Sequence, residues 1–279
     1  MVANRGFTLV ETLIALVLSS FVIVLVSHAF LVQNRFYSTQ TQRTAAQDNV
    51  RASTELIARE VRTAMEEGIV VAGARTLTVR SPIAVTVVCA RSGSAKDVFL
   101  DGGEGALDTD EVGGVAHRDP ATRDWIPVNT TWAAIDGSGN AAANCAANGA
   151  DTVGGSGSFH RLAGLNPLFG PPPGEGDVVM LFRETTFKIQ PSILDPSTLG
   201  IFRAAYGESL VEFATGVDTT AQFQYRTVGG GYADTVSAAS LASVDAVRLV
   251  ADARKPAPTG GVEDITFGWS VNVPLRLAR

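Results

Sequence analysis

The most prominent pattern in the chain is a nearly unbroken apolar run over residues 7–32. Nineteen of these 26 residues are Phe, Leu, Val, Ile or Ala, and none is Gly or Pro. At 1.5 Å per residue a helix of this length reaches about 39 Å, which exceeds the roughly 30 Å hydrocarbon core of a bilayer. The pattern predicts a helix that is long and apolar enough to cross a membrane.

A helical pattern continues beyond this run, on a more polar stretch that extends to about residue 67. Its apolar positions recur at spacings of seven, four and four, on one face of a helix: Val50, Ile57, Val61 and Met65. Leu56 and Ala64 flank this stripe, and Gly68 is the expected C-cap. We therefore expect one helix from about residue 8 to 67, with its second half packed against a sheet.

After Gly68 the pattern changes to short β-branched and alternating runs, which are typical of strands. The expected strands cover residues 76–80, 83–90, 178–189, 202–206, 210–214, 221–227, 246–251 and 265–273. Ser81 and Pro82 are expected to form a turn between the first two. A helix followed by strands predicts an α+β fold, in which the N-terminal helix packs on an antiparallel sheet that forms a head.

Residues 101–176 interrupt the strand pattern and show little periodicity of their own. The segment is rich in Gly, Ala, Asn and Asp, and it contains Trp125 and Trp132. A segment this long without a clear pattern is usually functional or disordered. We expect a long Gly-rich insertion that decorates the head and packs in part, not a separate domain.

The charge of the chain is low, and the deficit is local. Charged residues make up 18% of the sequence, and between Arg5 and Arg35 the only formal charge is Glu11. The net charge of −6, with Lys and Arg scattered, argues against a nucleic-acid surface. Two cysteines are too few for a structural zinc site.

Glu11 decides between three interpretations of the apolar run. A secretory signal peptide has a shorter apolar stretch and a small-residue cleavage site, which Gln33–Arg43 lacks. A plain membrane anchor leaves Glu11 unexplained, because a carboxylate inside an apolar span costs about 2.5–3.5 kcal/mol near its centre and less near its end. The third interpretation has to supply a partner for this carboxylate.

Residues 5–11 read Arg-Gly-Phe-Thr-Leu-Val-Glu, and they resemble the type III signal of prepilins, the precursors of type IV pili. The resemblance implies that prepilin peptidase cleaves after Gly6 and N-methylates Phe7, the new terminus. It also implies that Glu11 pairs with the terminal amine of a neighbouring subunit and sets its register. A buried carboxylate paired with an ammonium is tolerable, whereas either group alone is not.

The stretches 30–37 and 47–62, and more weakly the C-terminal residues 245–276, resemble the PilW family of minor type IV pilins. This resemblance implies a subunit that works with other minor and major pilins and an inner-membrane assembly platform to start pilus assembly, at or near the tip. Adhesion, twitching motility or DNA uptake would be the filament's activity. The alternatives are a J-type minor pseudopilin of type II secretion and a tip adhesin acting through residues 101–176.

These resemblances imply a division of the chain and a location. Residues 1–6 would be a cytoplasmic leader, residues 7–34 the transmembrane and assembly half of the helix, and residues 35–68 its amphipathic half. Residues 69–279 would form the β-rich head. The protein would be anchored in inner-membrane lipid by one span with its head in the periplasm, and would later reach the pilus at the cell surface.

Cys89 and Cys145 are the two cysteines, at the end of an expected strand and within the insertion. In an extracytoplasmic head they would most simply form one disulfide. Closing this loop would stabilise the head by about 4 kcal/mol in the chain-entropy model. Two free buried thiols are the alternative.

Five acidic residues crowd into the start of the insertion: Asp101, Glu104, Asp108, Asp110 and Glu111. Several carboxylates on a flexible loop could bind calcium. The EF-hand spacing is broken, because Val112 stands where a third Asp or Asn is needed. A solvated loop is the preferred interpretation, so no metal and no cofactor is predicted.

Catalytic motifs do not emerge from the sequence. His28, His117 and His160 are far apart along the chain, and Ser156 lies in a Gly-Gly-Ser-Gly-Ser stretch typical of a linker. A membrane-anchored hydrolase would need a nucleophile and a base that these positions do not supply. The sequence therefore predicts a structural subunit and not an enzyme.

Overall fold

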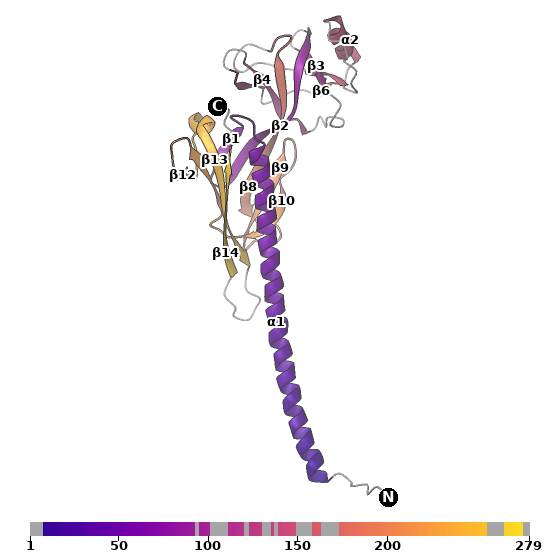
Figure 1. The fold of residues 1–279 in the computed structure, drawn as a ribbon, viewed down its shortest axis with the longest axis vertical. Coiled ribbons are helices and arrows are strands. Elements are labelled where there is room, and N and C mark those ends of the chain that lie inside the picture. The colour runs from indigo at the N-terminus through magenta and orange to yellow at the C-terminus, as the bar shows by residue number, and fades with distance from the viewer. Residues whose placement is uncertain are drawn as a thin grey trace. The chain divides into compact units, whose positions relative to one another are not determined.

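The computed structural model describes residues 8–92, 95–100, 111–119, 123–129, 135–136, 139–148, 158–162, 173–255 and 265–275. The chain divides into two compact units, Met1–Asp48 and Asn49–Arg279. Helix α1 (Leu9–Arg62) begins in the first unit and ends in the second, which holds the described strands (Figure 1). The predicted α+β layout, a long N-terminal helix followed by an antiparallel sheet, is confirmed.

The strands of the second unit form one sheet in which all pairs are antiparallel. They are β1 (Ile69–Gly73), β2 (Thr76–Ser92), β3 (Ala95–Leu100), β4 (Gly114–Arg118), β5 (Trp125–Asn129), β6 (Ile135–Asp136), β7 (Ser158–Leu162), β8 (Val178–Pro191), β9 (Leu199–Ala205), β10 (Val211–Val217), β11 (Gln222–Thr227), β12 (Tyr232–Ala233), β13 (Val244–Lys255) and β14 (Ile265–Pro274). Helix α2 (Gly139–Ala147) and the 3-10 helix η3 (Ala238–Ser243) complete the described elements.

The last turns of α1 pack on this sheet through the predicted stripe. Ile57 and Val61 belong to the main hydrophobic cluster, together with residues of β1, β2, β8, β9 and β11. Ala58 joins them, whereas Leu56, which was expected to flank the stripe, is 39% exposed. The buried face of the helix therefore extends to the side of Ala58 and not to the side of Leu56.

The helix ends at Arg62, so the predicted end near residue 67 and the C-cap at Gly68 are wrong. Tertiary pairing ends it, because the Met65 N–H donates to the carbonyl of Arg80 in β2 at 2.9 Å. Gly68 instead serves a tight turn, where an added Cβ would lie 2.6 Å from the Met65 carbonyl oxygen and 2.8 Å from that of Arg80. The chain must therefore leave the helix early to enter β1, an element that the sequence pattern did not reveal.

Strand β2 passes straight through Ser81 and Pro82, so the turn predicted there is wrong. The register between β2 and β8 shifts between Pro82 and Ala84. On the other edge of β2, β1 pairs only as far as Val79 and β3 only from Val87. Proline lacks an N–H and is tolerated at such a bulge on an unpaired edge.

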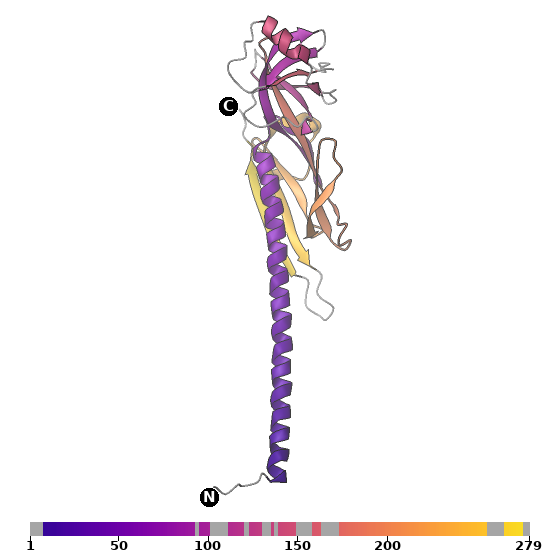
Figure 2. The ribbon, with the colours of Figure 1, turned by 90° about the vertical axis from the view of Figure 1, so that its right-hand side faces the viewer.

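Two of the three described hydrophobic clusters take residues from both β2 and β8, the strand pair that runs from one end of the head to the other (Figure 2). The main cluster takes Leu77 and Val79 from β2 and Phe187 from β8. A second cluster takes Val88 from β2 and Leu181 from β8. The two long strands therefore contribute to both cores.

The segment 101–176 is more regular than its sequence pattern indicated. Its described residues form β4, β5, β6, α2 and β7. β4 pairs with β8, and β7 pairs with β3. Val112, Val115 and Leu162 are buried in the second cluster. These described parts therefore belong to the head's own sheet and core.

We predict that Tyr225→Phe lowers the free energy of unfolding by about 1 kcal/mol, because it removes the hydroxyl that donates to two partly buried carbonyls. The Tyr225 hydroxyl donates to the Gly73 and Thr76 carbonyls at 2.9 and 3.1 Å. Burial raises the pKa of Tyr225 far above its usual value, so the donor stays protonated. Denaturant unfolding measures the loss, and Tyr206→Phe at an exposed position is the control, with an expected change within about 0.5 kcal/mol. Equal effects of the two substitutions would contradict the prediction.

Candidate functional site

The residues expected to direct processing and assembly lie at the N-terminal end of α1. Gly6 and Phe7 are outside the described residues, whereas Thr8 and Glu11 are described and exposed. Leu9 is the first helical residue, so Thr8 holds the N-cap position and Glu11 lies in the first turn.

Thr8 and Glu11 bond to each other across this first turn. The Glu11 N–H donates to Thr8 Oγ1 at 3.3 Å, and the Thr8 N–H donates to Glu11 Oε2 at 3.4 Å. This reciprocal arrangement is a capping box, which satisfies two N–H groups that a helix start otherwise leaves unpaired. The carboxylate also lies at the positive end of the helix macrodipole. Sequence reasoning that treats Glu11 only as the partner of an amine misses this contact, although the Thr-x-x-Glu spacing signals it.

The candidate membrane span covers Leu9–Thr41, 33 residues, and its most apolar stretch of 18 residues has a mean hydropathy of 2.7 and no buried part. Its large apolar side chains are exposed on all sides, as shown by Leu9 at 79% and Leu25 at 67%. A helix that is apolar all round needs lipid or other helices around it. Length and composition therefore fit a membrane anchor.

Several hydroxyl groups within this span bond to the backbone of their own helix. Thr12 Oγ1 donates to the carbonyls of Thr8 and Leu9 at 3.1 and 3.0 Å. Ser20 Oγ donates to the Val17 carbonyl at 2.7 Å. Polar groups that are satisfied inside the helix can enter an apolar environment at little cost.

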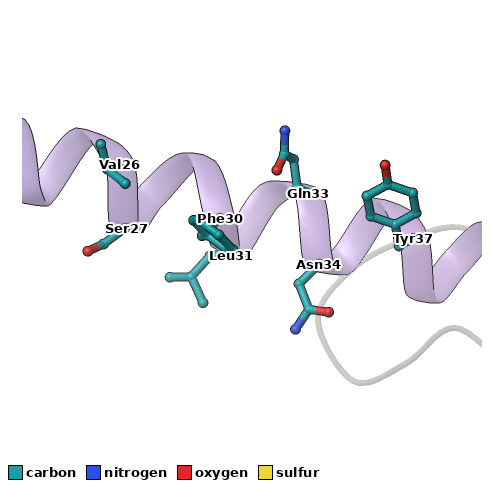
Figure 3. Close-up of a pocket in the computed structure, with 7 residues that line it drawn as sticks. All are labelled: Val26, Ser27, Phe30, Leu31, Gln33, Asn34 and Tyr37. Atoms are coloured by element: carbon teal, nitrogen blue, oxygen red, sulfur yellow. The ribbon is translucent and has the colours of Figure 1, made fainter.

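Near the end of the apolar run the side chains of α1 change from apolar to polar and aromatic. Seven residues line a shallow depression along this one helix: Val26, Ser27, Phe30, Leu31, Gln33, Asn34 and Tyr37 (Figure 3). Tyr37 also contacts Phe36 edge to face, with ring centroids 6.2 Å apart. Aromatic and polar residues at the end of a span are typical of the boundary between lipid and water.

Cys89 and Cys145 form a disulfide in the structure, with Cα atoms 5.0 Å apart and a sequence separation of 56 residues. The bond ties α2 to β2. Two side-chain amides add to this attachment: Asn144 Nδ2 in α2 donates to Asp97 Oδ2 at 2.7 Å, and Asn148 Nδ2, directly after α2, donates to the Cys89 carbonyl at 3.2 Å. α2 is therefore fixed to the sheet at three points.

The acidic cluster falls mostly outside the described residues, which include Glu111 but not Asp101, Glu104, Asp108 or Asp110. The Glu111 carboxylate pairs with Arg183, with Nη1 2.8 Å from Oε2. Within the described ranges no group of three or more His, Cys, Asp and Glu residues could hold a metal ion. The preferred interpretation as a solvated loop and the calcium alternative both stay untested predictions, and the one described member of the cluster has a cationic partner.

Comparison with known proteins identifies the N-terminal segment. Residues 1–27 match the family model of the prokaryotic N-terminal methylation motif. No curated protein and no solved structure matches the chain. The motif, joined to an exposed apolar helix and a β-rich head, indicates a membrane-anchored protein of the type IV pilin-like or pseudopilin class. It implies processing by prepilin peptidase and interaction with other pilins, which is the role of a structural subunit.

Proposed function

We propose that this protein is a minor type IV pilin similar to the PilW family, which takes part in starting pilus assembly at or near the pilus tip. The observation that carries the proposal is the match of residues 1–27 to the methylation motif, at the start of a helix whose span is fully exposed. The length of 279 residues also favours a minor subunit, since major pilins are commonly about half as long.

Prepilin peptidase cleaves between Gly6 and Phe7 and methylates Phe7 in this proposal. Residues 1–6 stay in the cytoplasm, and the apolar helix holds the subunit in the inner membrane with its head in the periplasm. The same apolar surface then packs against the helices of other subunits in the filament. The amine of Phe7 and the carboxylate of Glu11 set the register between neighbours.

The test is mass spectrometry of the protein purified from its native membrane. We expect an N-terminal peptide that begins with methylated Phe7, and we expect it to be missing from a Gly6→Phe variant, whose bulky side chain blocks cleavage. A native chain that retains Met1–Gly6 would contradict the proposal.

A J-type pseudopilin of type II secretion shares the same N-terminal motif, so processing alone does not separate the two. Sheared surface filaments do separate them. A minor pilin is expected in the sheared fraction together with other pilins, whereas a pseudopilin stays with the cell envelope. The methylated chain found only in the envelope would favour the pseudopilin.

A further inference from the structure

The free edge of strand β14 differs from the other open edges of the described sheet. β14 pairs with β13 through ten consecutive residue pairs, Ile265↔Lys255 to Pro274↔Ala246, without a register break. No described strand pairs with its other edge. At about 3.4 Å per residue, this edge presents unpaired N–H and C=O groups of every second residue over roughly 34 Å.

The sequence of β14 carries none of the usual protection of an edge strand. It reads Ile-Thr-Phe-Gly-Trp-Ser-Val-Asn-Val-Pro, with no charged residue and its one proline at the last position. Soluble proteins normally blunt an exposed edge by shortness, bulges, charges or proline, because an unprotected edge pairs with other chains. A long, uncharged and unbulged edge is therefore built to pair.

The other open edges of the described sheet are protected. β12 and β6 are two residues long each. β5 contains Pro127, and β1 is bulged between Ile69 and Val71. β10, which meets β13 at a single residue pair, has two register shifts and carries Glu212. The contrast singles out β14.

We propose that β14 is a docking edge that accepts an extended, uncharged strand from the head of another pilin-type subunit. The proposal rests on the proposed function, since it takes its partner from the class of subunits with which this protein assembles. Main-chain hydrogen bonds would supply the affinity, as in other cases where a strand is added to a sheet edge.

The methylation motif implies interaction with other pilins, and this implied interaction supplies the occupant of the edge. Pairing of the β14 edges of two copies of this chain is the alternative, and the cross-linking experiment separates that result from the proposal.

Site-specific photo-cross-linking of the full-length chain in its native cells tests the proposal. Ser270 is exposed on β14 and is replaced by p-benzoylphenylalanine, which reaches a neighbouring strand because cross-strand Cβ atoms lie about 5 Å apart. Val228, 63% exposed in the turn after β11, is the control position. We expect an adduct from position 270 that joins this chain to the head of another subunit bearing the methylation motif, and none from position 228.

A second pair of variants tests whether pairing at the edge causes the adduct. Asn272→Lys and Asn272→Thr both remove the amide that Tyr232 contacts, but only the lysine puts a charge on the edge. With the probe at 270, we expect Asn272→Lys to lower the adduct about tenfold and Asn272→Thr to change it less than about twofold. Thermal unfolding of both variants in detergent shows that they are folded.

The outcomes separate this proposal from the proposed function. The docking edge would be overturned if position 270 gave no adduct, or an adduct between two copies of this chain. It would also be overturned if positions 270 and 228 gave equal adducts, or if the two Asn272 variants lowered the adduct equally. If methylated Phe7 is found and the edge gives no adduct, only this inference fails. If Phe7 is not methylated, the proposed function fails whatever the edge binds.

Discussion

Glu11→Val is expected to leave cleavage and methylation intact but to reduce incorporation of the subunit into filaments at least about tenfold. The substitution keeps the span apolar, so membrane anchoring persists. It removes the carboxylate that would neutralise a neighbour's terminal amine inside the filament, and an unpaired buried ion costs several kcal/mol. Since about 1.4 kcal/mol corresponds to a tenfold change in an equilibrium, even part of this cost should be visible. Quantitative blotting of sheared filaments against total cell protein measures the ratio.

The capping box gives this experiment its matched controls. Glu11→Gln removes the charge, but glutamine can still cap the helix from this position. Thr8→Val keeps the charge and removes the hydroxyl that Glu11 contacts. The ion-pair role predicts that Glu11→Gln assembles as poorly as Glu11→Val, while Thr8→Val assembles nearly normally. The opposite ranking would mean that Glu11 acts by capping its own helix.

Removal of the disulfide by Cys89→Ala with Cys145→Ala is expected to lower the free energy of unfolding by about 4 kcal/mol. The bond closes a loop across a sequence separation of 56 residues. In the chain-entropy model, the disulfide removes conformational entropy from the unfolded chain, and for a loop of this length the resulting stabilisation is about 4 kcal/mol. For a head of this size, the loss corresponds to a fall in Tm of roughly 8–16 °C. Thermal unfolding of the full chain in detergent measures it.

Reduction of the wild-type protein is the control for the double substitution. A thiol reductant should lower the Tm of the wild type toward that of the variant and leave the variant unchanged. An unchanged Tm for the wild type under complete reduction would show that α2 is held by its other contacts alone. Asn144 and Asn148 would then be the next positions to change, since both bond to the strands beneath.

The sequence was informative wherever one strong pattern acted alone. The apolar run predicted the long helix, and the stripe through Ile57 and Val61 predicted its buried face. A helix that buries one face over several turns has apolar residues at the helical period, and this period can be recognised in the sequence. The residues around Glu11 indicated the class of protein because Glu11 is conspicuous. A membrane span contains few charged residues, so a single carboxylate within the apolar run is easy to recognise.

The errors arose where tertiary contacts overrode local signals. Nothing local ends the helix at Arg62, since its end depends on a bond from Met65 to the distant Arg80. Pro82 signals a turn in isolation, but it is tolerated in β2 because no described strand pairs with that edge there. The short strands of the segment 101–176 lack a period long enough to recognise. The open edge of β14 follows from sheet order, which the sequence does not state.

The shared strands β2 and β8 have a mechanical consequence if the subunit bears load in a filament, as the proposed function implies. They pair from Thr76↔Lys188 to Val87↔Val178, and so they pass through both hydrophobic clusters. Force that enters the head through α1 reaches the first cluster at Ile57 and Val61. Separating that cluster from the second along the strand direction would have to stretch both backbones, because β2 and β8 each run through both clusters. The head should therefore resist tension as one body.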